Sequence, residues 1–225
     1  MRAMSIGCCP PSVSVRVAIM WRIMDFAEVL RRRKAVRNYA EEPIPREVLE
    51  RIVARGKRIP SGGYSQGLRL VVVTDRDTRH RIAELAEEKE YVAMGFEPWI
   101  SRAPAHVVIG TREEDYHDRY RQPDKLQDDG TEIHWPVPYW HVDAGAAMML
   151  LMLAAVDEDL AAGVFGVLDW GPIWELLGIP EDILPVAIVT VGKAAPEPEE
   201  MQQRRSEAMR KRRRPLDEVI RWEHW

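Results

Sequence analysis

Polar and apolar residues alternate with helical spacing in the first part of the chain. This periodicity predicts helices over residues 26–33 and 46–55, because residues three and four apart share one face of a helix. Pro45 stands near the first turn of the second predicted helix, and Gly56 supplies a stop at its end.

Later in the chain, short β-branched and aliphatic runs bounded by turn residues predict strands. The predicted strands are residues 68–74, 105–110, 163–168 and 185–191. Further helices are predicted over residues 78–89, 141–157 and 172–177. Because helices and strands do not alternate strictly, the order predicts an α+β sandwich whose central, mainly antiparallel sheet is flanked by helices.

The predicted helix 141–157 is apolar around much of its circumference. Its longest apolar stretch, residues 144–156, falls short of the roughly 20 residues that span a bilayer. We therefore expect a buried helix, either central or at a subunit interface. Asp143 stands near its start and is interpreted most simply as an N-terminal cap.

Residues 111–140 form a polar, irregular segment between two regular regions. A loop of this length in a compact domain is typical of a lid or a binding element. Trp135, Tyr139 and Trp140 are its candidate substrate-facing side chains. The alternative is a surface insertion whose aromatic rings tuck into the nearest core.

Composition narrows the class of protein. The chain has 225 residues, 46% of them hydrophobic and 30% charged, which is typical of a globular domain. We expect one domain over residues 24–225, with a C-terminal arm over about 200–225. A net charge of −4 argues against a general nucleic-acid or membrane-surface binder, so the expected partners are small molecules or a second copy.

The cysteines and histidines predict neither a disulfide nor a metal site. Cys8 and Cys9 are adjacent, which suits neither a bridge nor a metal and favours a reducing cytoplasm. His117, His134 and His141 lack metal-like spacing. Residues 1–23 are expected to be a disordered extension, or to precede a true start at Met24.

Two basic clusters lie far apart in the sequence, at residues 32–37 and 211–214. Taken alone, such runs are more often solvated faces. Arg33 and Arg37 would share one face of a helix, whereas an extended turn would let Lys34 and the Ala35 amide join them. Guanidinium and ammonium groups in either arrangement can hold a phosphate, so we expect the fold to gather both clusters around one anion.

Several motifs carry a family resemblance. They are Arg33-x-Ala35-x-Arg37-x-Tyr39, Pro60-Ser61-Gly62-Gly63-Tyr64-Ser65-Gln66-Gly67-Leu68, the helix start from Tyr139 to Ala147, Leu177-Gly178-Ile179-Pro180, and Lys211-x-Arg213-x-Pro215-Leu216. Their order resembles that of the FMN-dependent nitroreductase family over about residues 24–225. Ala35 replaces the family's usual Ser, and Tyr64 its usual Asn.

The resemblance implies an intertwined homodimer with two FMN sites, each built from both chains. Arg33, Lys34, Ala35 and Arg37 would hold the phosphate, ribityl chain and O2 edge of the flavin, with Lys211 and Arg213 closing over the phosphate. Gly163, Val164, Phe165 and Gly166 would lie along the isoalloxazine. The other implied cofactor-binding residues are Pro60, Ser61, Gly62, Tyr64 and Gln66.

The implied activity is that of a cytoplasmic flavoprotein oxidoreductase. Hydride from NADPH or NADH would pass through flavin N5 to a nitroaromatic or quinone in ping-pong fashion, with no catalytic side chain because the flavin carries the chemistry. Alternatives in the family are a flavin-consuming dimethylbenzimidazole synthase and a dehalogenase. Two other classes are a non-catalytic flavin-binding protein and nucleic-acid binding through residues 204–214.

Overall fold

The computed structural model describes residues 24–196 and 199–225. Its core is a four-stranded sheet in the order β1-β2-β4-β3, with every neighbouring pair antiparallel. The strands are β1 (Leu68–Val73), β2 (Ala105–Thr111), β3 (Ala161–Phe165) and β4 (Leu184–Gly192). The predicted α+β sandwich with a mainly antiparallel sheet is confirmed.

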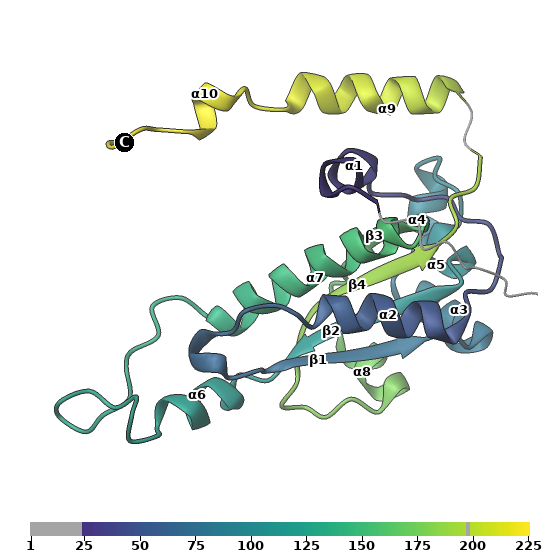
Figure 1. The fold of residues 1–225 in the computed structure, drawn as a ribbon. Helices are drawn as coiled ribbons and strands as arrows, with labels where there is room; N and C mark the ends of the chain where they lie inside the picture. The colour runs from purple at the N-terminus through teal and green to yellow at the C-terminus, as the bar shows by residue number, and fades with distance from the viewer. Residues whose placement is uncertain (1–23, 197–198) are drawn as a thin grey trace, which may run out of the picture.

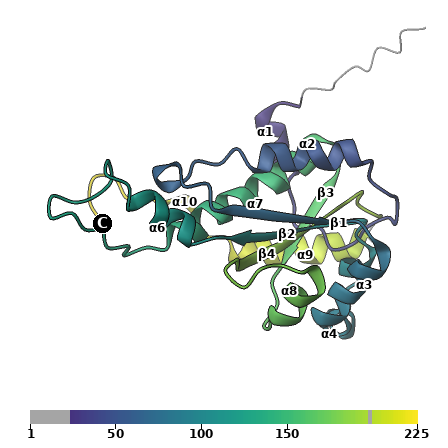
Figure 2. The ribbon, with the colours of Figure 1, turned by 90° about the horizontal axis from the view of Figure 1, so that it is seen from below.

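Helices cover both faces of the sheet (Figures 1 and 2). On one face, α2 (Arg46–Gly56) and α7 (Tyr139–Asp157) pack a cluster around Ile52 and Leu151. On the other face, the cluster includes Trp99, Ile100 and Ile173. The helices beyond that face are α3 (Arg76–Leu85), α4 (Glu88–Ala93), α5 (Trp99–Arg102) and α8 (Gly171–Leu177). β2 is buried along its whole length, as expected for a strand covered on both faces.

The remaining elements lie at the ends of the fold. α1 (Phe26–Arg32) precedes the first basic cluster, the short 3-10 helix η1 (Gly62–Tyr64) precedes β1, and α6 (Glu114–Tyr120) follows β2. After β4 the chain leaves the sheet as an arm that carries α9 (Glu199–Arg212) and α10 (Leu216–Val219) (Figure 1). Residues 1–23, for which we predicted an extension, lie outside the described residues.

The observed elements correct the sequence predictions in five places. The predicted helix 78–89 is two helices, α3 and α4, because Glu87 takes a left-handed conformation with φ of 54° between them. α5 was not predicted, α6 lies inside the segment expected to be irregular, and β3 begins two residues earlier than predicted. Asp143 is not the N-cap of α7, which starts at Tyr139 after Pro138.

In the described part of the chain, α7 is the one helix that is long and apolar enough to cross a membrane by length and composition. Half of its apolar window is buried inside the protein, so this is weak evidence for a span. Its exposed apolar side chains include Val142 and Met149, and a Cβ added at Gly145 would meet no atom within 4 Å. This face of α7 is therefore apolar and uncovered in the single chain.

Candidate functional site

The first basic cluster runs along the edge of the sheet as extended chain. α1 ends at Arg32, and Arg33 has ψ of 117°, so Arg33 and Arg37 do not share a helical face. The Val36 amide donates to the Ala162 carbonyl at 3.0 Å, and Ala35 forms a parallel bridge with Ala162. The extended alternative therefore holds, and we call residues 33–39 the arginine segment.

Glycine at position 163 allows this close approach. A Cβ at Gly163 would lie 2.4 Å from the Val36 carbonyl oxygen and 2.8 Å from Thr190 Oγ1. Tyr39 completes the anchor, since its buried hydroxyl lies 2.9 Å from Thr190 Oγ1 and burial raises its pKa well above the ordinary value. The arginine segment is thus fixed against β3 by backbone and by one buried side chain.

The cations of the arginine segment have no anionic partner among the described residues. Arg33 is half-buried and Lys34 exposed, and neither forms an ion pair or side-chain hydrogen bond within that part of the chain. Arg37 lies over the rings of Phe96 and Trp99, 5.2 and 5.7 Å from their centroids. By contrast, Arg31 and Arg32 just upstream are paired with Glu28 and Asp159. Three cations therefore remain available to an external anion.

The stretch 163–166 contributes mostly backbone to this edge. Phe165 is a core side chain, with its ring centroid 5.6 Å from that of Trp99 and 6.1 Å from that of His106. His106 is itself fully buried, and burial lowers its pKa to about 4, so it is neutral at pH 7. Val164 packs on the α7 side, and Gly166 is exposed. A ligand here would meet main chain rather than the Phe165 ring.

Residues 60–67, which we call the glycine loop, form the second candidate region. The Gly62 amide donates to Asp143 Oδ2 at 3.0 Å, and the Gln66 amide donates to Ser61 Oγ at 3.1 Å. Tyr64 and Gln66 both take positive φ, 63° and 55°, which is uncommon for residues other than Gly and Asn. The Tyr64 side chain is 75% exposed. Pro60 is exposed as well, so the loop presents several side chains outward.

α6 packs directly on the glycine loop. Tyr116 is fully buried and its hydroxyl donates to Asp143 Oδ2 at 2.6 Å. Burial first, then the Asp143 bond and charge, raise the pKa of Tyr116 well above its ordinary value. Arg119 Nε donates to the Gly63 carbonyl at 3.0 Å, and a Cβ at Gly63 would lie 2.6 Å from the Tyr120 ring. At Gly63 and Gly67, the side chains of α6 leave no room for a Cβ.

The aromatic residues of segment 111–140 form one cluster. Trp135 makes edge contacts with Tyr116, Tyr120, Tyr139 and Trp140. Its indole N–H donates to Glu132 at 2.8 Å. Trp140 is buried, Trp135 half-buried and Tyr139 44% exposed. Of the three candidate substrate-facing side chains, Tyr139 is thus the most open, whereas Trp140 is tucked into the fold.

The same segment has few basic side chains. Its four Lys and Arg residues are all engaged: Arg112 with Asp115 and Asp182, Arg119 with Asp124, Arg121 with Glu114 and Glu132, and Lys125 over the Tyr120 ring. His117 Nδ1 lies 2.6 Å from Glu132 Oε1. Burial lowers the pKa of His117, but its hydrogen bonds to Glu132 and Glu113 outweigh this effect, so the pKa is raised. The segment therefore presents aromatic rings beside an excess of acidic side chains, eight against four basic ones.

The arginine segment and the glycine loop lie at opposite ends of α7 (Figure 1). Arg32 contacts Asp159 just beyond the last turn of the helix, whereas Gly62 contacts Asp143 in its second turn. The 16 residues between these acidic side chains correspond to about 24 Å along a helix. One chain therefore does not bring the two regions to a single small ligand.

The second basic cluster also lies away from the first in the single chain. Lys211 is in the last turn of α9 and Arg213 follows it, and both are exposed. Helices α1 and α9 lie apart in both views of the fold (Figures 1 and 2). Our expectation that the fold gathers both clusters around one anion is therefore not met within one chain.

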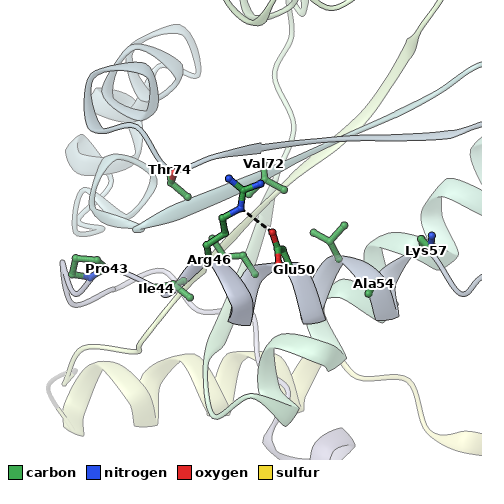
Figure 3. A pocket seen from close by; sticks show the side chains of 10 residues that line it. Pro43, Ile44, Arg46, Glu50, Ala54, Lys57, Val72 and Thr74 are labelled. Carbon is green, nitrogen blue, oxygen red and sulfur yellow. Dashed lines mark hydrogen bonds and ion pairs between the residues drawn. The ribbon is translucent and has the colours of Figure 1, made fainter.

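A groove of about 750 Å³ lies between α2 and the edge strand β1, lined by residues such as Leu49 and Val53 and crossed by the ion pair of Arg46 with Glu50 (Figure 3). It contains none of the predicted site residues. In the described ranges, no group of three or more His, Cys, Asp or Glu side chains is arranged to hold a metal ion.

The antiparallel sheet with helices on both faces places the chain in the α+β class of proteins. A profile of the Nitroreductase family matches residues 30–193, so the chain belongs to that family. The resemblance inferred from the motifs is confirmed.

Individual relatives point to related activities. The chain is 27% identical over 167 residues to FMN reductase [NAD(P)H] of Bacillus subtilis, covering 72% of this chain and 63% of that protein. It is 35% identical over 71 residues to rat iodotyrosine deiodinase 1, covering 32% of this chain and spanning only a quarter of that protein's length. A protein from Exiguobacterium sibiricum, described as a nitroreductase in complex with FMN, superposes with a TM-score of 0.67 at 19% identity, covering 89% of this chain and 98% of the other.

Sequence reasoning missed the joint role of Asp143 and Tyr116. Pro138 could have placed the helix start at Tyr139, two residues earlier than predicted, because proline favours the beginning of a helix. Asp143 would then have stood in the second turn of an apolar helix, where a carboxylate needs a buried partner.

Proposed function

We propose that this chain is an FMN-dependent oxidoreductase that uses NAD(P)H to reduce a neutral, planar, electron-poor acceptor of the nitroaromatic or quinone type. The observation that carries the proposal is the arginine segment, in which Arg33, Lys34 and Arg37 are ordered beside β3 without an anionic partner in the described part of the chain. Family membership makes a flavin phosphate the natural anion.

The residues at this edge fit FMN. Arg33 and Arg37 supply forked donors, Lys34 supplies a compact charge, and all three are carried on extended chain beside β3. Gly166 is exposed directly after β3, where main-chain amides without a side chain in the way can approach a ring closely. FMN would supply the redox chemistry when bound, with hydride from NAD(P)H passing through N5 and the two substrates using one face in turn. The protein supplies placement and positive charge.

The site requires two copies of the chain. The arginine segment of one copy and the glycine loop of the other can meet only if two α7 helices pack against each other in opposite directions. The apolar, uncovered face of α7 around Val142 and Met149 suits such packing. In this arrangement, Ser61, Tyr64 and Gln66 face a flavin held by the partner's arginine segment, and the arm of the chain that supplies the glycine loop can bring its Lys211 and Arg213 to that phosphate.

Acceptor preference follows from the aromatic cluster. The three arginines of segment 111–140 are paired with carboxylates and Lys125 lies over the Tyr120 ring, while eight acidic against four basic residues make the segment acidic. It therefore disfavours an anionic acceptor, and its rings favour stacking with a neutral planar molecule. Reductive dehalogenation of a halogenated phenol is the second candidate, because the chain matches iodotyrosine deiodinases over 71 residues.

The purified protein provides the test. We expect a yellow protein whose flavin, released by heat and identified as FMN, bleaches anaerobically with NADPH or NADH and recovers on addition of a quinone or nitroaromatic. Recovery with a halogenated phenol and release of halide would favour the second candidate. Bound FMN that neither nucleotide bleaches would indicate a flavin-binding protein without turnover, and a protein that binds no FMN would refute the proposal.

A further inference from the structure

Asp143 is a buried carboxylate in the middle of an apolar surface. It is 9% exposed, and its neighbours on α7 include the buried residues Trp140, Ala144 and Ala147. Because α7 begins at Tyr139, four residues earlier, the side chain does not cap the helix. A carboxylate in such a position is costly unless its oxygens accept hydrogen bonds, so its partners indicate its role.

Both partners meet the same oxygen. Asp143 Oδ2 accepts from the Gly62 amide at 3.0 Å and from the Tyr116 hydroxyl at 2.6 Å. Gly62 belongs to the glycine loop and Tyr116 to α6. One atom of the central helix therefore joins the loop to the segment that packs over it.

Packing reinforces this junction. The Tyr116 ring lies 3.6 Å from a Cβ position at Gly62 and 2.6 Å from one at Gly67, so the ring fills the space between the two ends of the loop. Between them, Tyr64 and Gln66 hold left-handed conformations that most side chains avoid. Such a conformation persists only where the surroundings fix it, and Asp143 fixes the residue at which the turn begins.

We infer that Asp143 is a positioning residue for the flavin and for the acceptor above it: through Oδ2 it holds the glycine loop and α6 together, so that Tyr64 and Gln66 are presented in one fixed arrangement. The inference rests on the proposed function for what the loop contacts. The loop geometry itself depends on Asp143 whatever ligand binds.

The structure also separates position from charge. Because a single oxygen accepts both bonds, Asp143→Asn keeps an oxygen that can take the place of Oδ2, although the charge is lost. Asp143→Leu has a similar size and removes both acceptors, leaving the Gly62 amide and the Tyr116 hydroxyl without a partner. Tyr116→Phe removes one donor and keeps the ring.

In the full-length protein, we expect Asp143→Leu to weaken FMN binding about tenfold or more. At saturating FMN it should raise the KM for a quinone acceptor about tenfold or more and change kcat less than about threefold. Asp143→Asn should stay within about threefold of wild type in both constants, and Tyr116→Phe should fall between the two. The matched control is Glu158→Gln, which alters a half-buried carboxylate that joins α7 to α2 at the other end of the helix.

Amide hydrogen exchange over residues 60–67 gives a readout that needs neither flavin nor turnover. Exchange should accelerate about tenfold or more in Asp143→Leu and stay near wild type in Asp143→Asn and Glu158→Gln. Wild-type exchange and KM in Asp143→Leu would overturn the inference. Equal damage in Asn and Leu variants would also overturn it, because charge rather than position would then be responsible. If wild type binds no FMN, the proposed function fails while the exchange result still decides this inference.

Discussion

Arg37 combines a structural contact with a free charge. Its guanidinium lies over Phe96 and Trp99, which fixes its direction, yet no carboxylate of the described chain neutralises it. A cation held in this way by aromatic faces is preorganised for an anion, because few of its rotamers remain to be lost on binding.

Replacing Arg37 by Ala should weaken FMN binding about tenfold to a hundredfold, since a charge-assisted hydrogen bond contributes roughly 1.5–3 kcal/mol. The free energy of unfolding should fall by only about 0.5–1 kcal/mol, the usual size of a cation–π contact. Fluorescence titration with FMN and urea unfolding measure the two quantities. Arg46→Ala, on the exposed face of α2, is the control. Unchanged FMN affinity in Arg37→Ala would make the arginine a surface charge only.

Tyr64 shows strain at a single residue. Its φ of 63° is unfavourable for a side chain with a Cβ, and its ring is mostly in solvent. Tyr64→Gly should therefore raise the free energy of unfolding, measured in urea, by about 0 to 1 kcal/mol. This range includes the opposing effect of glycine's flexibility in the unfolded chain. The acceptor KM should rise if the ring contacts the acceptor. A loss of more than about 1 kcal/mol would show that the Tyr64 ring makes stabilising contacts in the assembled protein.

At the scale of elements, α7 organises the molecule. It packs on the sheet and on α2. Just beyond one end of the helix, Asp159 forms an ion pair with Arg32, and near the other end Asp143 accepts a hydrogen bond from the glycine loop. Near the same end as Asp159, Glu158 accepts hydrogen bonds from Arg51 at 2.6 Å and Arg55 at 2.8 Å. This group of charges fixes the C-terminal end of α7 against α2.

The pairing of Glu158 predicts a pH dependence. The hydrogen bond from Arg51 is the first cause that lowers the pKa of Glu158, with the charges of both arginines adding to it. Because folding lowers the pKa of Glu158, the ionised carboxylate stabilises the folded state above the ordinary pKa of a glutamate. This stabilisation is lost as the pH falls through the lower pKa of the folded state. Glu158→Gln should lower the free energy of unfolding by about 1–2 kcal/mol at pH 7, between typical exposed and buried pairs, and by progressively less as the pH falls through the lowered folded pKa. Urea unfolding across this range measures the difference, and a pH-independent difference would contradict it.

Regular elements could be predicted from the sequence where one local signal was sufficient. The pattern around Ile52 predicted α2, and the runs at 68–74 and 185–191 predicted β1 and β4 closely. The break between α3 and α4 at Glu87 and the short helices α5 and α6 depend on tertiary contacts, such as the buried Glu88 carboxylate that accepts from the Ile100 and Ser101 amides. Local periodicity carries no information about such contacts.

For the candidate site too, local motifs could be predicted from the sequence, whereas tertiary contacts could not. The motif around Arg33 and Arg37 and the glycine residues of the second region could be read from the sequence, and their role in a site stays a prediction. That the two regions lie at opposite ends of one helix could not be read from the sequence, because it depends on where α7 directs the chain. Asp143 was misinterpreted as a cap because its buried partners, Gly62 and Tyr116, are 81 and 27 residues away in the sequence.

At the scale of the whole molecule, the separation of the arginine segment from the glycine loop along α7 means that the proposed function requires a dimer. Met149→Glu places a charge in the middle of the exposed apolar face of α7. We expect this variant to become monomeric in light scattering and to lose FMN, because burying an unpaired charge in an interface is strongly unfavourable. Glu84→Lys, on α3 on the other side of the sheet, is a charge-changing control. A dimeric, FMN-bound Met149→Glu variant would place the subunit interface elsewhere.

The proposal that one FMN is held by two chains can be tested by complementation. One chain carries Arg37→Ala and the other carries Gln66→Ala, and differently tagged copies are co-expressed so that the mixed dimer can be purified. In each parental homodimer both sites carry one defect, whereas the mixed dimer has one site with both residues intact and one with both replaced. We predict that the mixed dimer binds one FMN per dimer with wild-type affinity, whereas both homodimers bind weakly. Weak binding by the mixed dimer, equal to that of its parents, would contradict a flavin site built from two chains.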